Sequence, residues 1–392
     1  MMRTQVAIVG AGPAGLTLAL LLRRRGIESV VLERRDRAYV ERRVRAGLLE
    51  HNTVEVLRDL GVADRLEREG MVHDGISLRH QGITQHVPIA SLVGRQVTIY
   101  GQQEVVKDLI AAWLGGGGEL RFEVGEVAMH DLEADRPLVS YTFQGSGVEL
   151  ECDFIAGCDG FQGVSRRTIP DELRVEHEYV YPFAWLGILA EAPPSTDELI
   201  YAWHAEGFAL YSMRSPKLSR LYLQVPGDEQ LENWPDERIW AELQTRLMAP
   251  QWRVNEGPIL DRGITPMRSF VCETMRHGRL FLAGDAAHIV PPTGAKGLNL
   301  AVNDVRLLAA ALGEFYAAGS QAALDAYPGT ALRRVWRAQE FSNYMTRLLH
   351  DLGQGAFQQQ LQLARLEYLS RSSAAACSLA ENYAGLPAAP DF

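Results

Sequence analysis

A glycine loop near the N-terminus is the first pattern that could do chemistry. Gly10, Gly12 and Gly15 follow the order G-x-G-x-x-G between an apolar run and a stretch of helix formers. Glycine permits a tight turn and lets a pyrophosphate approach the backbone, while the following helix directs free N–H groups at the phosphate. Glu33 ends a second apolar run, where a carboxylate can bind ribose hydroxyls. The pattern predicts a dinucleotide site and does not by itself distinguish FAD from NAD.

Two pairs of glycine and aspartate also follow strand-like runs. Asp159-Gly160 follows Asp153–Ala156, and Gly284-Asp285 follows Leu280–Ala283. An Asp-Gly pair after a strand is usually only a turn. The second pair, however, opens the stretch GDAAHIVPPTGAKGLN, in which two prolines lie back to back. Because proline restricts the backbone and glycine permits close approach, this stretch is predicted to form a rigid wall beside a ligand.

A third pattern lies in a predicted hairpin that turns at Ser215–Ser219. Arg214 is expected to pair with Arg220. Ser212 would then pair with Tyr222, and alternation along the strands would place these polar side chains on one face. The opposite face would carry Ala209, Tyr211, Met213, Leu221 and Leu223. The polar face is either a solvated surface or a clamp whose arginine fork and hydroxyl groups bind a carboxylate.

Composition and charge restrict the class of protein. The chain has 392 residues, of which 47% are apolar and 22% charged, as in an ordinary globular protein. A net charge of −10 argues against nucleic acid or an anionic membrane as the main partner. The four cysteines form no C-x-x-C pair, and no apolar run near the N-terminus could span a bilayer. We therefore expect a cytoplasmic protein, and we expect no metal site.

The elements that must position these groups change type along the chain. A strand over Gln5–Val9, a helix over Leu16–Arg25 and a strand over Ile27–Leu32 form a predicted βαβ unit. Strand-like runs dominate from about residue 179 to 225, and helical patterns dominate after Leu298. We predict a nucleotide-binding domain over 1–176, a β-rich domain over 177–268, a return to the first domain over 269–350, and a helical extension over 351–392.

The glycine loop, Cys158-Asp159-Gly160 and Gly284-Asp285 together resemble the single-component FAD aromatic hydroxylases. The resemblance extends from residue 3 to about residue 387 and is closest to members that act on 4-hydroxybenzoate. It is carried by Arg43-x-Arg45-Ala46-Gly47, Tyr100-Gly101-Gln102, Tyr201, Ser212-x-Arg214, Pro291–Asn299 and Glu381-Asn382-Tyr383. It implies a Rossmann-type FAD-binding domain in a mixed α/β fold, α+β overall, with an inserted β-rich substrate domain and a C-terminal extension that forms a dimer interface.

The resemblance also implies where the cofactors bind. Asp285 would bind the ribityl chain, and the backbone from Gly297 to Asn299 would face the flavin ring. The implied FAD-binding residues are Gly10, Gly12, Gly15, Glu33, Arg43, Arg45, Gln102, Asp159, Arg220, Asp285, Gly297, Leu298 and Asn299. Because only one Rossmann loop exists, the nicotinamide cofactor would bind through Arg34, Tyr39, Arg45, Arg166 and Arg268. These basic groups favour NADPH, although Gln162 stands where histidine is expected, so NADH stays open.

By the same resemblance, Ser212, Arg214 and Tyr222 would bind the substrate carboxylate, and Tyr201, Pro292 and Thr293 would contact the rest of the substrate. Tyr201 and Tyr383 would relay the phenol proton, and His73 would exchange it with solvent. The Pro292 carbonyl would face the phenol. The phenolate would attack a flavin C4a-hydroperoxide formed from O₂, giving 3,4-dihydroxybenzoate.

One residue departs from the pattern of the hydroxylases that this chain resembles, and two alternative functions stay open. Trp203 stands where asparagine is expected, two residues after Tyr201 and therefore on the same strand face. The enzyme could hydroxylate another aromatic acid, such as an aminobenzoate or a dihydroxybenzoate. The chain could also be a flavin-binding protein without oxygenase activity.

Overall fold

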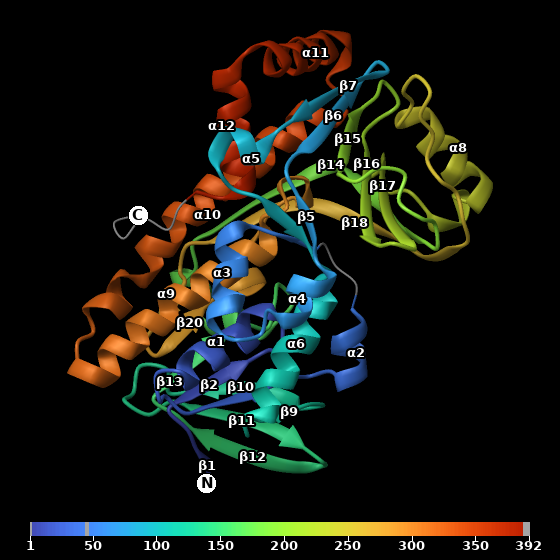
Figure 1. The fold of residues 1–392 in the computed structure, drawn as a ribbon. Coiled ribbons are helices and arrows are strands. Elements are labelled where there is room, and N and C mark those ends of the chain that lie inside the picture. The colour runs from blue at the N-terminus through green and yellow to red at the C-terminus, as the bar shows by residue number, and fades with distance from the viewer. Residues whose placement is uncertain (1, 44–46, 387–392) are drawn as a thin grey trace.

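A sheet that is parallel except for its edge strand β19 forms the centre of the first lobe in the computed structural model, which describes residues 2–43 and 47–386 (Figure 1). Six strands lie in the order β19-β20-β13-β2-β3-β9. Their bounds are β2 (Val6–Val9), β3 (Ser29–Leu32), β9 (Glu119–Arg121), β13 (Phe154–Gly157), β19 (Arg276–His277) and β20 (Leu280–Leu282). The sequences VAIV, SVVL and FIAG are buried throughout, as expected for parallel strands covered on both faces. The βαβ unit predicted from the sequence is confirmed.

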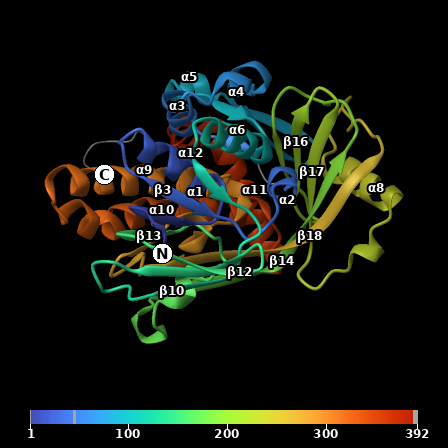
Figure 2. The same ribbon diagram turned by 90° about the horizontal axis from the view of Figure 1, so that it is seen from below.

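Helices cover one face of this sheet, and an antiparallel sheet covers the other (Figure 2). The helices are α1 (Pro13–Arg23), α6 (Gln102–Gly115) and α9 (Gly297–Ala318), and α1 contacts both of the others. The antiparallel sheet has the order β1-β12-β11-β10, with bounds β1 (Met2–Arg3), β10 (Gly125–His130), β11 (Leu138–Phe143) and β12 (Ser146–Glu151). Apolar residues of all these layers share one core.

An eight-stranded sheet dominates the second lobe, in the order β21-β18-β14-β17-β16-β15-β6-β7. Its strands are β6 (Ile76–His80), β7 (Ile83–Val87), β14 (Glu176–Ala190), β15 (Ile200–Trp203), β16 (Ala209–Ser215), β17 (Leu218–Pro226), β18 (Ile259–Cys272) and β21 (His288–Ile289). One face packs against α8 (Asp236–Arg246), and the other packs against the C-terminal helices. Because β6 pairs with β15, this sheet includes a segment that precedes residue 177. The domain boundaries themselves stay a prediction.

The register of the β16–β17 hairpin differs from the predicted one by two residues. Ser212 pairs with Arg220, and Leu210 pairs with Tyr222. The turn is shorter than expected because Ser215 already pairs with Leu218. The predicted pairing is therefore wrong, but a slip of two residues preserves the faces, whereas a slip of one would exchange them. The apolar set shares the opposite face, as predicted, and is buried on the side of α8.

Three long helices follow α9 and run from the first lobe to the top of the second (Figure 1). They are α10 (Ala322–Leu349), α11 (Gly355–Arg371) and α12 (Ser373–Ala384). A small sheet of β4 (Leu48–Leu49), β8 (Val97–Ile99) and β5 (Met71–His73) joins the lobes. The short helices are α2 (Arg37–Arg42), α3 (His51–Asp59), α4 (Asp64–Glu69), α5 (Ile89–Val93) and α7 (Ser165–Thr168), with 3-10 turns at Asp171–Leu173, Leu231–Asn233, Gly284–Ala286 and Pro292–Gly294. None of the helices within the described ranges is long and apolar enough to cross a membrane.

Candidate active site

The glycine loop is crowded at Gly10 and Gly15 but open at Gly12. Gly10 has a φ of +108°, and a Cβ there would lie 2.3 Å from the Cys158 carbonyl oxygen. A Cβ on Gly15 would lie 2.0 Å from the Gly10 carbonyl oxygen. A Cβ on Gly12, which caps α1, would meet nothing within 4 Å. Gly10 and Gly15 therefore serve the close packing of the fold. Gly12 keeps open the approach to the N–H groups and the positive end of the α1 dipole.

Glu33 lies at the carboxyl end of β3, beside this loop. Its carboxylate accepts hydrogen bonds from the backbone N–H groups of Ala11 at 2.9 Å and Arg35 at 2.8 Å. Nearby, Arg43 is exposed at the end of α2, and Gln102 is the first residue of α6. Arg45 lies outside the described residues. Glu33 is thus held against the phosphate loop at the place where the sequence predicts a ribose partner.

The two Gly-Asp elements border the same edge of the sheet. Asp159 accepts a hydrogen bond from the Ser165 N–H at 2.9 Å, and burial raises the pKa of its carboxyl group. Asp285 is exposed within the turn Gly284–Ala286. Asp304 fixes that turn because its Oδ2 accepts from the Gly284 N–H at 2.9 Å and lies 2.6 Å from His288 Nε2. The Asp285 side chain is therefore presented at the surface of a fixed turn.

The proline–glycine wall, residues 291–297, is held rigid by its packing and its hydrogen bonds. A Cβ on Gly294 would lie 2.5 Å from the Ser342 Oγ, so α10 packs directly on the turn. Ala295 adopts a φ of +55°, and its N–H donates to the Pro292 carbonyl at 2.9 Å. Thr293 is buried, and its hydroxyl accepts from the Thr346 hydroxyl at 3.1 Å. The Pro292 carbonyl is thus engaged within the turn and retains one lone pair for a substrate.

The start of α9 is bound tightly to the chain before α3. The Asn299 side chain accepts from the Glu50 N–H at 2.9 Å and donates to the Leu48 carbonyl at 3.1 Å. Lys296 forms an ion pair with Glu50 and donates to the Tyr383 carbonyl at 3.0 Å. Gly297 and Leu298, the first residues of α9, are partly buried. Their backbone can therefore face the ring of a bound flavin, as the resemblance implies.

The polar hairpin residues gather as the sequence predicts. Arg214 donates to the Ser212 hydroxyl at 2.9 Å and to the Met213 carbonyl at 3.0 Å, while its Nε has no hydrogen-bond partner among the described residues. Burial lowers the pKa of the Arg214 guanidinium. Burial alone would raise the pKa of the Tyr222 phenol, but the charges of Arg214 and Arg220 lower it. A cation desolvated in this way favours an anionic ligand.

A buried pair of phenols lies beside this cluster. The Tyr201 and Tyr383 hydroxyl oxygens are 2.7 Å apart. Burial raises the pKa of both phenols, so both are neutral in the protein without substrate. A hydrogen-bonded pair of neutral phenols can pass a proton along its length, because each hydroxyl both donates and accepts.

His73 corrects one expectation. The sequence places it at the solvent end of the relay, but its side chain is only 2% exposed, because β5 pairs with β8 across the join between the lobes. Burial lowers its pKa to about 4, so the imidazole is neutral at pH 7. Neither ring nitrogen has a hydrogen-bond partner among the described residues.

The residues predicted to bind the nicotinamide cofactor differ in how exposed they are. Arg34 and Tyr39 are exposed around α2. Arg268 is half-buried, pairs with Glu178 at 3.0 Å and stacks on the Phe161 ring. Arg166 differs, because it is 7% exposed and its guanidinium contacts Glu176 and the Phe161 and Ala286 carbonyls. The structure therefore shows Arg166 in contacts that join its own loop to β14 and to the turn Gly284–Ala286.

Sequence reasoning missed several buried partners. His288 with Asp304, Glu50 with Lys296, and Trp203 with Gln362 each form a contact across distant segments. Asp304 could have been noticed, because it falls four residues after Leu300 on the apolar face of α9. The other pairs carry no sequence signal, since their members are far apart in the chain. Groups of three or more residues that could hold a metal ion are absent from the described part of the chain.

Comparison with known proteins agrees with this geometry. A family model described as an FAD binding domain matches residues 3–342. The p-hydroxybenzoate hydroxylase of Acinetobacter baylyi is 48% identical over 98% of this chain and 96% of its own length. The 3-amino-4-hydroxybenzoate 2-monooxygenase of Streptomyces cremeus is 28% identical over 79% of this chain and 78% of its own length. The crystal structure of p-nitrophenol 4-monooxygenase from Pseudomonas putida superimposes with a TM-score of 0.84 over 99% of this chain and all of its own, at 19% identity.

The fold and the site define a flavoprotein aromatic monooxygenase, with FAD as cofactor and NAD(P)H as electron donor. The chain belongs to the FAD-binding-domain family of hydroxylases, which includes the p-hydroxybenzoate hydroxylase of Acinetobacter baylyi.

Proposed function

We propose that this enzyme hydroxylates 4-hydroxybenzoate beside its phenol to give 3,4-dihydroxybenzoate, consuming NAD(P)H and O₂. The observation that carries the proposal is the combination of a partly unpartnered Arg214 guanidinium with a buried pair of phenols. A para-substituted substrate needs a carboxylate partner at one end and a proton acceptor at the other. The 48% identity to a p-hydroxybenzoate hydroxylase supports the same substrate.

The flavin would lie between the glycine loop and the proline–glycine wall. Glu33 would bind its adenosine ribose, Asp285 its ribityl chain, and the start of α9 its ring. Gly12 supports this fit, because no atom lies within 4 Å of the place where a Cβ would stand. When bound and reduced, FAD supplies the activated oxygen for the hydroxylation. Arg220, which hydrogen-bonds to the Tyr222 hydroxyl at 3.4 Å, would steady the ring from the sheet side.

The protein's own contribution is to orient the substrate and ionise its phenol. Arg214, Ser212 and Tyr222 would bind the carboxylate, with the guanidinium fork setting the ring plane. The Tyr201 hydroxyl would accept the phenol proton as the Tyr383 hydroxyl passes its own onward. A phenolate donates electrons to an electrophile far better than a phenol, whose pKa is about 10 in tyrosine. Pro292 and Thr293 would close the site beside the phenol, which helps to exclude water.

The finer assignments belong to the same proposal. His73 would take the relayed proton through ordered water, since its neutral imidazole has unpartnered nitrogens. We propose NADPH as the donor, with NADH as the alternative. The residues proposed to bind it are Arg34, Tyr39, Arg45, Arg166 and Arg268. The exposed Phe357, Leu361 and Tyr368 of α11 support a homodimer. The four cysteines, all free, agree with a cytoplasmic location.

Turnover of a substrate panel tests the proposal. Purified enzyme with FAD is given NADPH or NADH and 4-hydroxybenzoate, 4-aminobenzoate, 3,4-dihydroxybenzoate or 3-amino-4-hydroxybenzoate, and products are identified by mass spectrometry. We expect fast NADPH oxidation and nearly one 3,4-dihydroxybenzoate per NADPH only with 4-hydroxybenzoate. A coupled product from an amino-substituted acid would instead favour the activity named for the Streptomyces cremeus relative. Oxidation that yields only hydrogen peroxide would show that 4-hydroxybenzoate stimulates the enzyme without being its substrate.

A further inference from the structure

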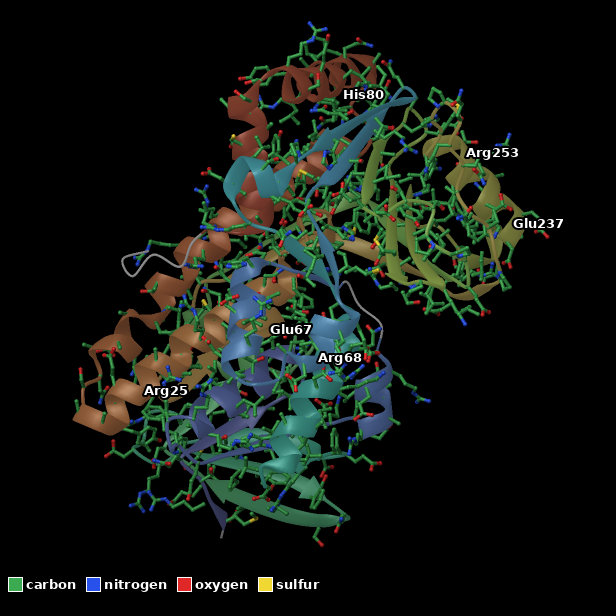
Figure 3. The ribbon with its side chains drawn as sticks, viewed as in Figure 1. Arg25, Glu67, Arg68, His80, Glu237 and Arg253 are labelled. Carbon is green, nitrogen blue, oxygen red and sulfur yellow. The ribbon has the colours of Figure 1, made fainter. Side chains whose placement is uncertain are left out.

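Trp203 lines a surface cavity and is a neighbour, on the same strand, of Tyr201, one member of the buried tyrosine pair. It is 6% exposed and shares the face of β15 with Tyr201, which is 1% exposed. Residues two apart on a strand lie about 7 Å from each other and point to the same face, so Trp203 and Tyr201 are neighbours in one core cluster. The cavity, of about 180 Å³, is lined by Trp203 together with Arg79, His80, His204, Arg246 and Met248. Figure 3 shows His80, one of the lining residues, at the edge of the second lobe near α11.

A single buried residue of α11 fixes the indole. The Trp203 Nε1–H donates to the Gln362 Oε1 at 2.8 Å. The Gln362 amide donates in turn to the carbonyls of Arg347 and His350, both at 2.7 Å. Every polar atom of the Gln362 amide is therefore satisfied, and the acceptor oxygen is satisfied by Trp203. Without that indole the oxygen would be buried and unpaired, which is unfavourable.

Further contacts connect this bond to the relay. Gln362 is the only buried polar residue within α11, and α12, which carries Tyr383, begins directly after Ser372. The strand β15 is therefore attached to the C-terminal helices at two neighbouring points, Tyr201–Tyr383 and Trp203–Gln362. A shift of α11 and α12 together relative to β15 would alter the separation of the two phenols. The cavity would also open toward them if the indole moved.

We infer that Trp203, held by Gln362, is a positioning residue that seals the tyrosine pair from the outer cavity. It keeps solvent of the outer cavity away from the two phenols and fixes the distance between their hydroxyl groups. The inference rests on the proposed hydroxylation for its catalytic consequence, whereas the sealing itself is a property of the fold.

The test compares Trp203→Ala, Trp203→Phe and Gln362→Leu with a matched control, Trp240→Ala. Trp240 is 8% exposed and packs in the core on the opposite, α8 face of the sheet, so its truncation creates a similar loss of volume away from the relay. Each FAD-loaded enzyme is treated with tetranitromethane, and nitration of Tyr201 and Tyr383 is mapped by mass spectrometry. The peroxide released per NADPH oxidised with 4-hydroxybenzoate is measured in parallel.

We expect nitration of both tyrosines to be slow in the wild type and in Trp240→Ala. Trp203→Ala should accelerate it at least tenfold and raise the peroxide fraction severalfold, while Trp203→Phe and Gln362→Leu should give smaller increases. Equal nitration in Trp203→Ala and the wild type, or equal acceleration in Trp240→Ala, would overturn the inference. If the wild type forms no 3,4-dihydroxybenzoate, the proposed function fails, but nitration still decides whether Trp203 seals the pair. If Trp203→Ala does not fold, Gln362→Leu and Trp203→Phe decide in its place.

Discussion

At the scale of single residues, Arg214 combines a desolvated charge with an Nε that has no hydrogen-bond partner among the described residues. A bound carboxylate would compensate the charge and would accept a hydrogen bond from the Nε. The guanidinium fork can bind both oxygens of a carboxylate. Lysine keeps the charge and loses the fork. The difference between the two side chains therefore isolates the contribution of the bidentate geometry.

Arg214→Lys should weaken 4-hydroxybenzoate binding about 10- to 100-fold, or about 1.5–3 kcal/mol, because a hydrogen bond to a charged group is lost. Titration of the flavin absorbance with substrate measures the dissociation constant. Lys217→Gln, a change at an exposed residue of the same hairpin, is the control and should leave it unchanged. An unaltered affinity in Arg214→Lys would exclude a carboxylate clamp at this position.

A second prediction at the scale of single residues concerns His350 and the dependence of stability on pH. Its Nε2 accepts from the Trp185 indole at 2.7 Å, its Nδ1 lies 3.0 Å from the Thr346 carbonyl, and burial lowers its pKa to about 3. The unfolded imidazole, with a pKa near 6.5, binds a proton first as the pH falls. Stability should therefore decrease between pH 6.5 and 3, by up to about 1.4 kcal/mol per pH unit for this histidine.

His350→Gln should flatten this dependence, because an amide can accept and donate in the same two directions without titrating. Urea unfolding of the FAD-loaded protein at pH 7, 6 and 5 measures the slope. A variant with the same slope as the wild type would show that other groups, such as His73, govern the acid sensitivity.

At the scale of elements, the three glycines of the β2–α1 loop have separable roles. Gly10 and Gly15 are required where backbone segments touch, whereas Gly12 faces open space. A methyl group at Gly12 therefore leaves the fold intact but obstructs the pyrophosphate.

Gly12→Ala should raise the dissociation constant of FAD by at least about tenfold with little change in the circular dichroism of the apoprotein. Gly10→Ala should instead reduce the yield of folded protein, because its Cβ would overlap the Cys158 carbonyl. Fluorescence titration of apoprotein with FAD distinguishes the two effects. Normal FAD affinity in Gly12→Ala would place the phosphates elsewhere.

The sequence predicts the local parts of the site better than its long-range parts. The βαβ unit, the hairpin faces and the proline–glycine wall follow from periodicity and turn chemistry over short distances. The predicted register of the hairpin is wrong by two residues, because the length of the turn sets the register. Burial of His73 and the pairing of Trp203 with Gln362 depend on packing between segments that are remote in sequence. No local pattern encodes such contacts.

At the scale of the whole molecule, α11 presents apolar side chains to solvent. Phe357 is 77% exposed, and Leu361 and Tyr368 are each 48% exposed. Large exposed apolar side chains gathered on one helix commonly mark an interface. The homodimer proposed above would bury them.

Phe357→Glu should shift the protein from dimer to monomer in sedimentation velocity experiments at micromolar concentration, because a carboxylate is costly to bury. Leu260→Glu introduces the same charge at another exposed apolar residue, on β18, and should leave the assembly unchanged. A wild type that sediments as a monomer would contradict the proposed dimer.

The pairing of β6 with β15 has a consequence for chimaeras in which segments are exchanged between related proteins. The second lobe cannot be transferred as residues 177–268 alone, because β15 would lose its neighbour and expose an unpaired edge. A chimaera that carries the β6–β7 segment, residues 76–87, along with the later strands preserves that edge. Recombination within this family should therefore succeed only when two separate stretches of chain are inherited together.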